Sequence, residues 1–277
     1  GIILSIMREG TKNMYDGFVR VAAGTPEIFV ADPARNADAV VAMMNEAAAQ
    51  GVKLLALPEL CLTGYTAGDL FLQGVLRKAA LAALERVVAA SAGLDLLLCV
   101  GLPLEVEGRL YNCAAVVKDG ALLGAVPKRF PPNYGEFYEL RHFAPGPAAA
   151  REVELLGQRV PFGGDLIFEC DEMPEFRVAV EICEDLWAPE SPSIGHALAG
   201  ATVIVNLSAS DEIVGKRDYR ELLVKAQSRK LIAGYLYADA GAGESTTDMV
   251  FAGHNLIAEN GTLLSQTAPF EGGLAVT

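Results

Sequence analysis

The sequence predicts an α/β fold, arranged as a four-layer α-β-β-α sandwich with an internal pseudo-twofold duplication. Buried apolar strands alternate with amphipathic helices, a pattern typical of sheets that carry helices on one face. The same order of elements also occurs twice along the 277 residues. Two such halves would pack sheet against sheet, with their helices on the two outer faces.

The first half reads as strand, helix, strand, helix, strand and hairpin. Its helices are predicted from apolar residues at helical spacing, and its strands from short apolar or alternating runs. Asp119-Gly120 is typical of a two-residue hairpin turn. The expected elements are a strand at Glu27–Ala31, a helix at Asn36–Gln50, a strand at Lys53–Pro58, a helix at Leu70–Ser91, a strand at Asp95–Gly101 and a hairpin of Tyr111–Val117 with Ala121–Pro127.

The same order recurs from Phe176 onward. The two hairpins also have similar sequences, NCAAVVKDGALL at 112–123 and NLIAENGTLL at 255–264, which indicates a duplicated unit. The expected elements are a strand ending at Cys183, a helix over about 191–199, a strand at Thr202–Leu207, a helix at 218–233, a strand at Tyr235–Asp239 and a hairpin of Gly253–Glu259 with Thr262–Thr267.

Composition excludes several classes of function. The net charge is −13 and no run of lysine or arginine forms a patch, so nucleic acid and anionic membranes are poor partners. The apolar stretch Ile2–Ile6 is too short to span a bilayer. Five cysteines without CxxC spacing predict reduced thiols in a cytoplasmic protein. Three scattered histidines leave little material for a metal site. We expect residues 1–14 to be a tag or an extension without function, and residues 15–277 to form one domain.

Side chains that could take part in catalysis follow the predicted strands. Cys183 ends a strand in RVAVEICEDLW (177–187), Glu59 follows another, and Lys128 follows the first hairpin. The carboxyl ends of such strands converge on one edge, where ligands bind. A thiol that attacks an amide needs a base and an oxyanion partner, and without a usable histidine the base has to be a carboxylate. Each residue also has an interpretation without catalysis: Cys183 as a buried thiol, Glu59 as a solvated acid and Lys128 as a surface lysine.

Three motifs together resemble the nitrilase (carbon–nitrogen hydrolase) superfamily with its Glu-Lys-Cys triad. They are PELCLTGY at 58–65, PKRFPPNYGEFYE at 127–139 and EICEDLW at 181–187. The wording of GYTAGDLF (64–71), GKRDYR (215–220) and GAGESTTD (241–248) resembles one branch, the N-terminal glutaminase domain of glutamine-dependent NAD synthetases. The resemblance extends over nearly the whole chain and implies a nitrilase-like sandwich.

The resemblance implies a glutamine amidohydrolase. Cys183 would attack the side-chain amide of L-glutamine and form a thioester, with Glu59 as general base. Lys128 would stabilise the oxyanion, helped by the backbone N–H of Glu184, and Glu136 would orient the lysine and the water. The side chains that match the substrate pocket are Tyr65, Phe137, Glu139, Glu184, Ser210 and Lys216. In that pocket an acid would bind the α-amino group and hydroxyls the carboxylate.

NAD synthetases of this branch carry a second domain with an SGGxDS loop for ATP, and no such loop occurs in this sequence. We therefore expect an excised amino-terminal domain that would supply ammonia for NAD synthesis from deamido-NAD. The resemblance implies that ATP, Mg and deamido-NAD bind only to the absent synthetase domain. For the domain in this sequence it implies neither a cofactor nor a metal. It also implies a homo-oligomer.

Two other readings stay open. The chain could be a natural standalone C–N hydrolase that acts on another small amide or an N-carbamoyl compound. It could also be a non-catalytic member kept as an oligomeric scaffold, although the intact triad argues against that. One local departure lies beside the lysine, where Arg129-Phe130-Pro131 replaces the Thr-Tyr-Leu more often found in the branch. The acidic pair Glu184-Asp185 reads either as a solvated turn or as part of an oxyanion hole.

Overall fold

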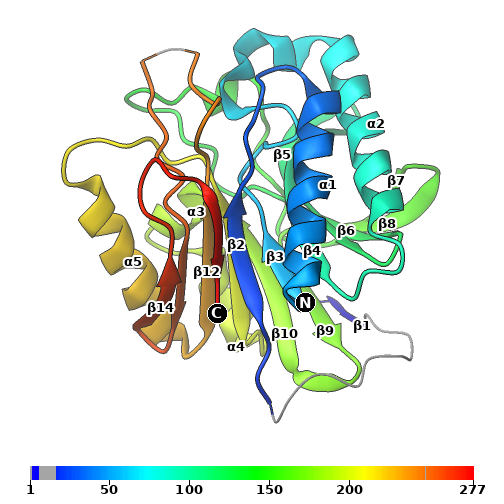
Figure 1. Cartoon of the computed structure of the whole chain (residues 1–277). Coiled ribbons are helices and arrows are strands. Elements are labelled where there is room, and N and C mark those ends of the chain that lie inside the picture. Colours follow the sequence, from blue (N-terminus) through cyan, green and yellow to red (C-terminus); the bar gives the residue numbers. More distant parts are fainter. Residues whose placement is uncertain (1, 6–16, 247) are drawn as a thin grey trace.

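The computed structural model describes residues 2–5, 17–246 and 248–277. Two β-sheets pack face to face, and each carries helices on its outer face (Figure 1). Helices α1 (Pro33–Ala49) and α2 (Gly74–Ala90) cover one sheet, and α4 (Pro192–Leu198) and α5 (Lys216–Leu231) cover the other. The predicted four-layer α-β-β-α sandwich is confirmed.

Within the described residues, the first sheet has eight strands in the order β15-β2-β3-β4-β5-β6-β8-β7. Strands β2, β3 and β4 run parallel, and β5 and β6 continue as an antiparallel meander. Their bounds are β2 Val21–Thr25, β3 Leu54–Ala56, β4 Leu97–Val106, β5 Arg109–Lys118, β6 Ala121–Pro127, β7 Arg151–Leu155, β8 Gln158–Phe162 and β15 Gly273–Val276.

The second sheet repeats this plan over the described part of the chain. Its seven strands lie in the order β1-β9-β10-β11-β12-β13-β14, with β10, β11 and β12 parallel and β13 and β14 antiparallel. Three parallel strands followed by an antiparallel hairpin therefore occur in both halves, which confirms the duplication. Their bounds are β1 Ile2–Ser5, β9 Leu166–Cys170, β10 Met173–Ile182, β11 Val203–Ser208, β12 Gly234–Asp239, β13 Leu256–Glu259 and β14 Thr262–Gln266.

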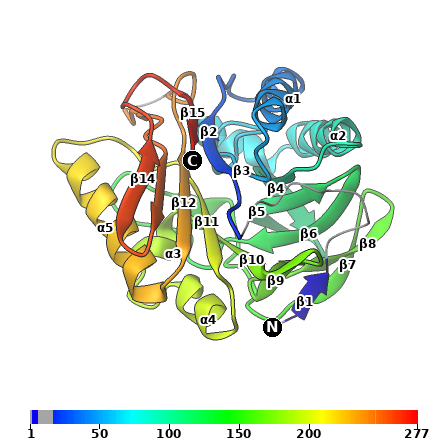
Figure 2. The ribbon, with the colours of Figure 1, turned by 60° about the horizontal axis from the view of Figure 1, so that its bottom comes forward.

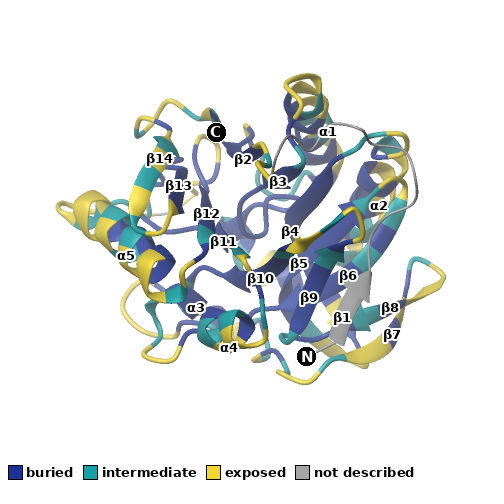
Figure 3. Cartoon of the chain, turned by 90° about the horizontal axis from the view of Figure 1, so that it is seen from below, coloured by how far each residue is buried: buried dark blue, intermediate teal, exposed yellow. Residues whose placement is uncertain are grey.

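Apolar side chains fill all three interfaces between the layers. One cluster lies between the first sheet and α1 and α2, a second between the two sheets, and a third between the second sheet and α5. The central strands are buried while the outer faces of the helices are exposed (Figure 3). Strands buried on both faces lack polar alternation, which is why they read as continuous apolar runs in the sequence.

Two predicted elements need correction. The stretch predicted as a strand, Glu27–Ala31, is a loop in which the N–H of Ala31 donates to the carbonyl of Thr63, and the strand that precedes it is β2. The predicted helix Leu70–Ser91 is a 3-10 segment, η1 (Tyr65–Leu72), followed by α2. β1, β7, β8, β9 and β15 were not expected, because strands of only four or five residues give a weak sequence signal.

β1 lies at the edge of the second sheet and pairs in parallel with β9, as Figure 2 shows near the N-terminus. Residues 6–14 of the expected extension lie outside the described residues. That residues 1–14 carry no function stays a prediction. No helix in the described ranges is both long enough and apolar enough to cross a membrane.

Candidate active site

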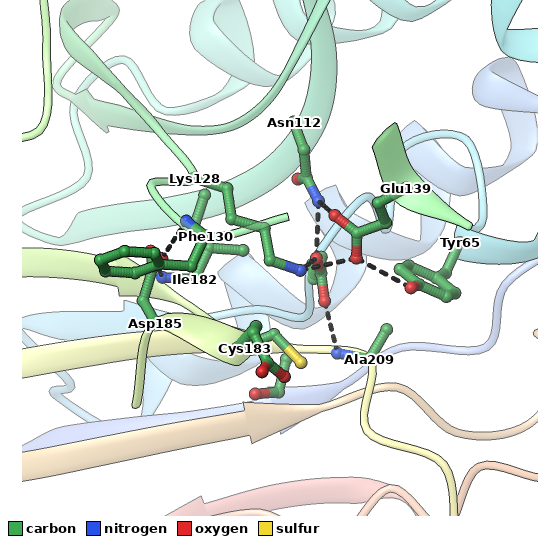
Figure 4. Close-up of polar contacts among 12 residues, drawn as sticks. Tyr65, Asn112, Lys128, Phe130, Glu139, Ile182, Cys183, Asp185 and Ala209 are labelled. Carbon is green, nitrogen blue, oxygen red and sulfur yellow. Dashed lines mark hydrogen bonds and ion pairs between the residues drawn. The ribbon is translucent and has the colours of Figure 1, made fainter. Parts of the chain in front are cut away.

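Three strand ends bring the predicted triad together. Glu59 follows β3 and Lys128 follows β6 in the first sheet, while Cys183 follows β10 in the second. All three side chains are buried, with 0%, 1% and 7% of their surface exposed. Figure 4 shows the Cys183 sulfur below the Lys128 amino group, with the backbone of Ala209 beside it. The reactive groups thus meet between the two sheets.

Lys128 is held between two carboxylates. Its Nζ lies 2.6 Å from Oε1 of Glu59 and 2.6 Å from Oε1 of Glu139. Burial by itself would lower the pKa of Lys128, but the carboxylates of Glu139 and Glu59 outweigh it and hold that pKa well above its usual value. The lysine is therefore a permanent cation at a fixed position, as an oxyanion partner has to be.

The contact expected of Glu136 is made by Glu139. Glu136 is exposed at the rim of a cavity, whereas Glu139 is 4% exposed and pairs with Lys128. The hydroxyl of Tyr65 donates to the same carboxylate at 2.8 Å. Burial raises the pKa of Glu139, against the lowering effect of Lys128. Glu139 is thus paired with the lysine, and its predicted place in the substrate pocket stays a prediction.

Two residues that the sequence did not single out hold the carboxylate of Glu59. The side-chain amide of Asn112 donates to Oε1 at 2.6 Å, and the backbone N–H of Ala209 donates to Oε2 at 2.9 Å. Both carboxylate oxygens of Glu59 are therefore held in a fixed orientation. Asn112 is the first residue of the sequence that the two hairpins have in common. That repeat was the only sequence signal that distinguished it.

Cys183 lies in a strained turn. Its φ is 45° and its ψ is −100°, a conformation that L residues rarely adopt and that costs about 1–3 kcal/mol. Its N–H donates to the carbonyl of Leu207 at 2.9 Å and to Oδ1 of Asn206 at 3.1 Å. The sharp turn from strand to helix presents the sulfur between the sheets, as a nucleophile at a strand end requires.

The thiol is protonated at rest. Burial, followed by the negative charge of Glu59, raises the pKa of Cys183 well above its usual value, while the Lys128 ammonium lowers it only in part. A neutral thiol is a weak nucleophile and depends on a base close by. The charge of Glu59 acts on the thiol more strongly than that of Glu139, and both carboxylates pair with Lys128. That Glu59 is the general base stays a prediction.

Asp185, two residues after the nucleophile, is not the solvated turn residue that one reading allowed. It is 1% exposed and accepts hydrogen bonds from the N–H groups of Phe130 at 2.8 Å, Arg129 at 3.1 Å and Ile182 at 2.9 Å. Its side chain therefore links the turn of Cys183 to the loop after Lys128. Nothing local in the sequence marks it, because two of its three partners are more than 50 positions away.

A cavity of about 310 Å³ is lined by Glu139, the carboxylate that pairs with Lys128, but by none of the three triad residues themselves. Among the predicted pocket residues, Tyr65, Phe137 and Glu139 line it, and Asp248 and Met249 close its far side. The loop that carries Asp248 is tied to the pocket, because Oε2 of Glu244 accepts the N–H of Tyr65 at 2.7 Å. A chamber of this size accommodates a small amino acid.

The other predicted pocket residues do not line this cavity. Ser210 is buried, and its hydroxyl has no hydrogen-bond partner among the described residues. Glu184 is half-buried and accepts from the hydroxyl of Tyr134 at 2.9 Å. Lys216 pairs with Asp211, and its Nζ lies 5.8 Å from the ring centre of Phe137. Lys216 is therefore the member that touches a residue of the cavity wall.

A larger cavity, about 350 Å³, is lined by residues of the lysine loop and, like the smaller one, by none of the triad. It is lined by Arg129, Phe130, Asp185 and His196, among others. Within the described ranges no cluster of histidine, cysteine, aspartate and glutamate is arranged to hold a metal ion. The chemistry present at the triad is that of a thiol, a carboxylate and an ammonium group.

Comparison with known proteins agrees with this arrangement. A sequence profile of the carbon–nitrogen hydrolase family matches residues 20–276. Glutamine-dependent NAD(+) synthetase of Mycobacterium tuberculosis is 45% identical over 258 residues, which are 93% of this chain and 38% of the relative. The chain thus spans well under half the length of this curated relative.

Solved structures agree on the fold. A crystal structure of a glutamine-dependent NAD(+) synthetase from Cytophaga hutchinsonii superposes with a TM-score of 0.83 at 29% identity, covering 94% of this chain and 42% of that one. An amidase from Nesterenkonia, at 21% identity and a TM-score of 0.73, shares the fold over 94% of this chain and 92% of its own. With its sandwich, its three strand-end residues and this matching profile, the chain belongs to the carbon–nitrogen hydrolase family.

Proposed function

We propose that this chain hydrolyses the side-chain amide of L-glutamine to glutamate and ammonia through a thioester on Cys183. The observation that carries the proposal is the buried ammonium of Lys128, held at 2.6 Å from Glu59 on the side of the thiol. The names of the relatives supply the substrate, since they are glutamine-dependent NAD(+) synthetases.

In the first half-reaction the thiol gives its proton to Glu59 as sulfur bonds to the amide carbon. The carbonyl oxygen becomes an oxyanion, stabilised by the Lys128 ammonium and by the backbone N–H of Glu184 at the start of α3 (Glu184–Trp187). The tetrahedral intermediate collapses when the C–N bond breaks. Glu59 returns the proton to the leaving nitrogen, so that ammonia departs and a glutamyl thioester remains.

In the second half-reaction water replaces ammonia. Glu59 removes a proton from the water as its oxygen bonds to the thioester carbon, and Lys128 again faces the oxyanion. The C–S bond then breaks, and the sulfur recovers the proton held by Glu59. Glutamine and water have become glutamate and ammonia, and the thiol and carboxylate are restored.

The substrate is expected in the 310 Å³ cavity, with its amide toward Cys183. Tyr65 and Phe137 would form the walls, and Glu139 would act through Lys128. The unpartnered hydroxyl of Ser210 is suited to the substrate carboxylate. Glu184, directly after the nucleophile in the chain, and Lys216, near the ring of Phe137, complete the proposed set as charged groups.

The setting of this activity is part of the proposal. In a full-length protein the ammonia would pass to a synthetase domain that binds ATP, Mg and deamido-NAD, while this domain needs neither cofactor nor metal. Assembly as a homo-oligomer follows from the family resemblance. All five cysteines are free and buried, which fits a reducing compartment such as the cytoplasm.

The test is intact-mass spectrometry after reaction with a diazo-ketone analogue of glutamine, followed by peptide mapping. We expect one adduct, on Cys183, that excess L-glutamine prevents. An adduct that forms equally with and without glutamine would support the triad but indicate a different substrate, another small amide or an N-carbamoyl compound. Absence of an adduct on Cys183 would refute the catalytic assignment.

A further inference from the structure

The nucleophile and its two partners come from different halves of the sandwich. Glu59 and Lys128 belong to the first sheet, and Cys183 belongs to the second. The distance from the sulfur to the base and to the cation therefore depends on how the two sheets are aligned at the site. Catalysis is sensitive to such alignment, because a misplacement of about 1 Å costs about 100-fold in rate.

Asp185 joins the two sides at this point. Its Oδ1 accepts the N–H of Phe130 at 2.8 Å and that of Arg129 at 3.1 Å, directly after Lys128 in the chain. Its Oδ2 accepts the N–H of Ile182 at 2.9 Å, directly before Cys183, and shares the N–H of Arg129 at 3.3 Å. A single buried carboxylate thus contacts the residues next to the cation and next to the nucleophile (Figure 4).

The same contact supports the strained turn. The conformation at Cys183, with φ of 45°, persists only where neighbouring contacts enforce it. The bond from Ile182 to Asp185 closes the turn across the nucleophile. The N–H of Leu186 donates to the carbonyl of Cys183 at 3.0 Å and closes it from the other side.

We propose that Asp185 is a positioning residue, whose carboxylate holds the strained Cys183 turn with one oxygen and the lysine loop with the other. It touches neither substrate nor the reacting atoms, and it acts through the alignment of the two sheets. This rests on the proposed amide hydrolysis, and it deepens that proposal by naming what keeps the triad in register.

Asparagine is the informative replacement at this position. An asparagine has one oxygen and an amino group in place of two acceptors, so it cannot accept the N–H groups of Phe130 and Ile182 together. Whichever way the amide is turned, its amino group faces one of these two N–H groups, and that contact is lost. Asp185→Ala removes both contacts, so the series from wild type through Asn to Ala should show increasing effects.

Asp165→Asn is a matched control. Asp165 is also an aspartate that ties one loop to another, since its Oδ1 accepts the N–H of Ala150 at 2.7 Å. It lies in the turn before β9 and contacts neither Cys183 nor Lys128 in any described interaction. The tether runs from the residue before β7 of the first sheet to the residue before β9 of the second, so its replacement removes a comparable contact between the sheets at a place away from the triad.

Two readouts test the proposal on the folded chain. The first is the pH profile of Cys183 alkylation by iodoacetamide, which does not depend on glutamine. Burial, Glu59, Lys128 and Glu139 act together on this thiol. Loosening their geometry in Asp185→Asn should shift the profile toward that of an ordinary thiol. The second is glutamine turnover, where kcat should fall about 100-fold while KM changes little.

The outcomes separate the two proposals. A shifted profile in Asp185→Asn, with an unchanged one in Asp165→Asn, supports the positioning role even if wild type fails to hydrolyse glutamine, which would refute only the proposed function. Wild-type profile and kcat in Asp185→Asn would overturn the inference. It would be overturned equally if Asp165→Asn lowered kcat as far as Asp185→Asn at the same loss of unfolding free energy.

Discussion

The carboxylate of Glu59 accepts the backbone N–H of Ala209 at 2.9 Å, although the two residues are 150 positions apart. Glu59 follows a strand of the first sheet and Ala209 follows β11 of the second. Together with the Asn112 amide, this bond fixes both oxygens of the proposed base. The base is therefore oriented by contacts from both halves before any substrate arrives.

Glu59→Gln should abolish most of the turnover. The amide keeps an oxygen for Lys128 but cannot accept a proton, so kcat for glutamine should fall about 100- to 10,000-fold. Alkylation of Cys183 should also slow, because the thiol loses its base. Steady-state assays and alkylation kinetics measure both, with circular dichroism as the check on folding. Alkylation at the wild-type rate would remove Glu59 from the role of base.

Lys128→Met should be harmful to stability as well as to activity. It leaves the carboxylates of Glu59 and Glu139 buried without their cation, and breaking a buried ion pair from one side costs about 3–5 kcal/mol. Urea unfolding would measure this loss. The control is Lys225→Met, whose exposed pair with Glu221 lies on the surface of α5 and should contribute less than about 1 kcal/mol. Similar losses in both variants would contradict the pairing described here.

Replacements of Cys183 separate chemistry from strain. Both Cys183→Ala and Cys183→Gly should lose all turnover and the mass adduct, because no sulfur remains. They should differ in stability, since glycine adopts a φ of 45° without penalty while alanine does not. We expect the glycine variant to exceed the alanine variant by about 1 kcal/mol in unfolding free energy. The reverse order would show that the turn is not strained.

Glu244 predicts a pH dependence of stability. Burial raises its pKa to about 8, and Oε1 has no hydrogen-bond partner among the described residues. The folded state therefore favours the protonated acid. Its contribution to stability is complete at acidic pH and is lost as the pH rises from the ordinary glutamate range toward 8.

Glu244→Gln should remove this dependence, because the amide stays neutral and its oxygen can still accept the N–H of Tyr65. We expect the variant to be close to wild type near pH 5 and to be more stable than wild type near pH 8, by roughly 3 kcal/mol. Urea unfolding at the two pH values measures the difference. A wild-type advantage at the higher pH would refute the argument.

The sequence predicted most of the fold because its long helices and its two hairpins have strong periodic signals. The triad was predicted because its motifs combine residue type with spacing. Glu136 and Glu139 show the limit of prediction from sequence motifs. Both lie on one loop, and their spacing alone does not tell which side chain turns inward. In the structure the N–H of Glu139 donates to the carbonyl of Pro132 at 3.0 Å, and the turn that follows points its carboxylate at Lys128.

Asp185 and Asn112 were missed for a related reason. Their partners come from strands and loops far along the chain, so no local pattern distinguishes them from surface polar residues. Only the folded arrangement shows that Asp185 accepts donors from both sides of the site. Residues whose role is to connect distant segments are the ones that a single sequence hides.

The division of the triad between the two sheets makes turnover a measure of assembly. A chain cut in the turn between β7 and β8 would yield two pieces, neither of which holds a nucleophile together with its base and cation. Mixing the pieces would restore ammonia release only to the extent that the sandwich re-forms. Fragment complementation, followed by this reaction, would therefore report on packing between the sheets far more sensitively than a spectroscopic signal averaged over the whole molecule.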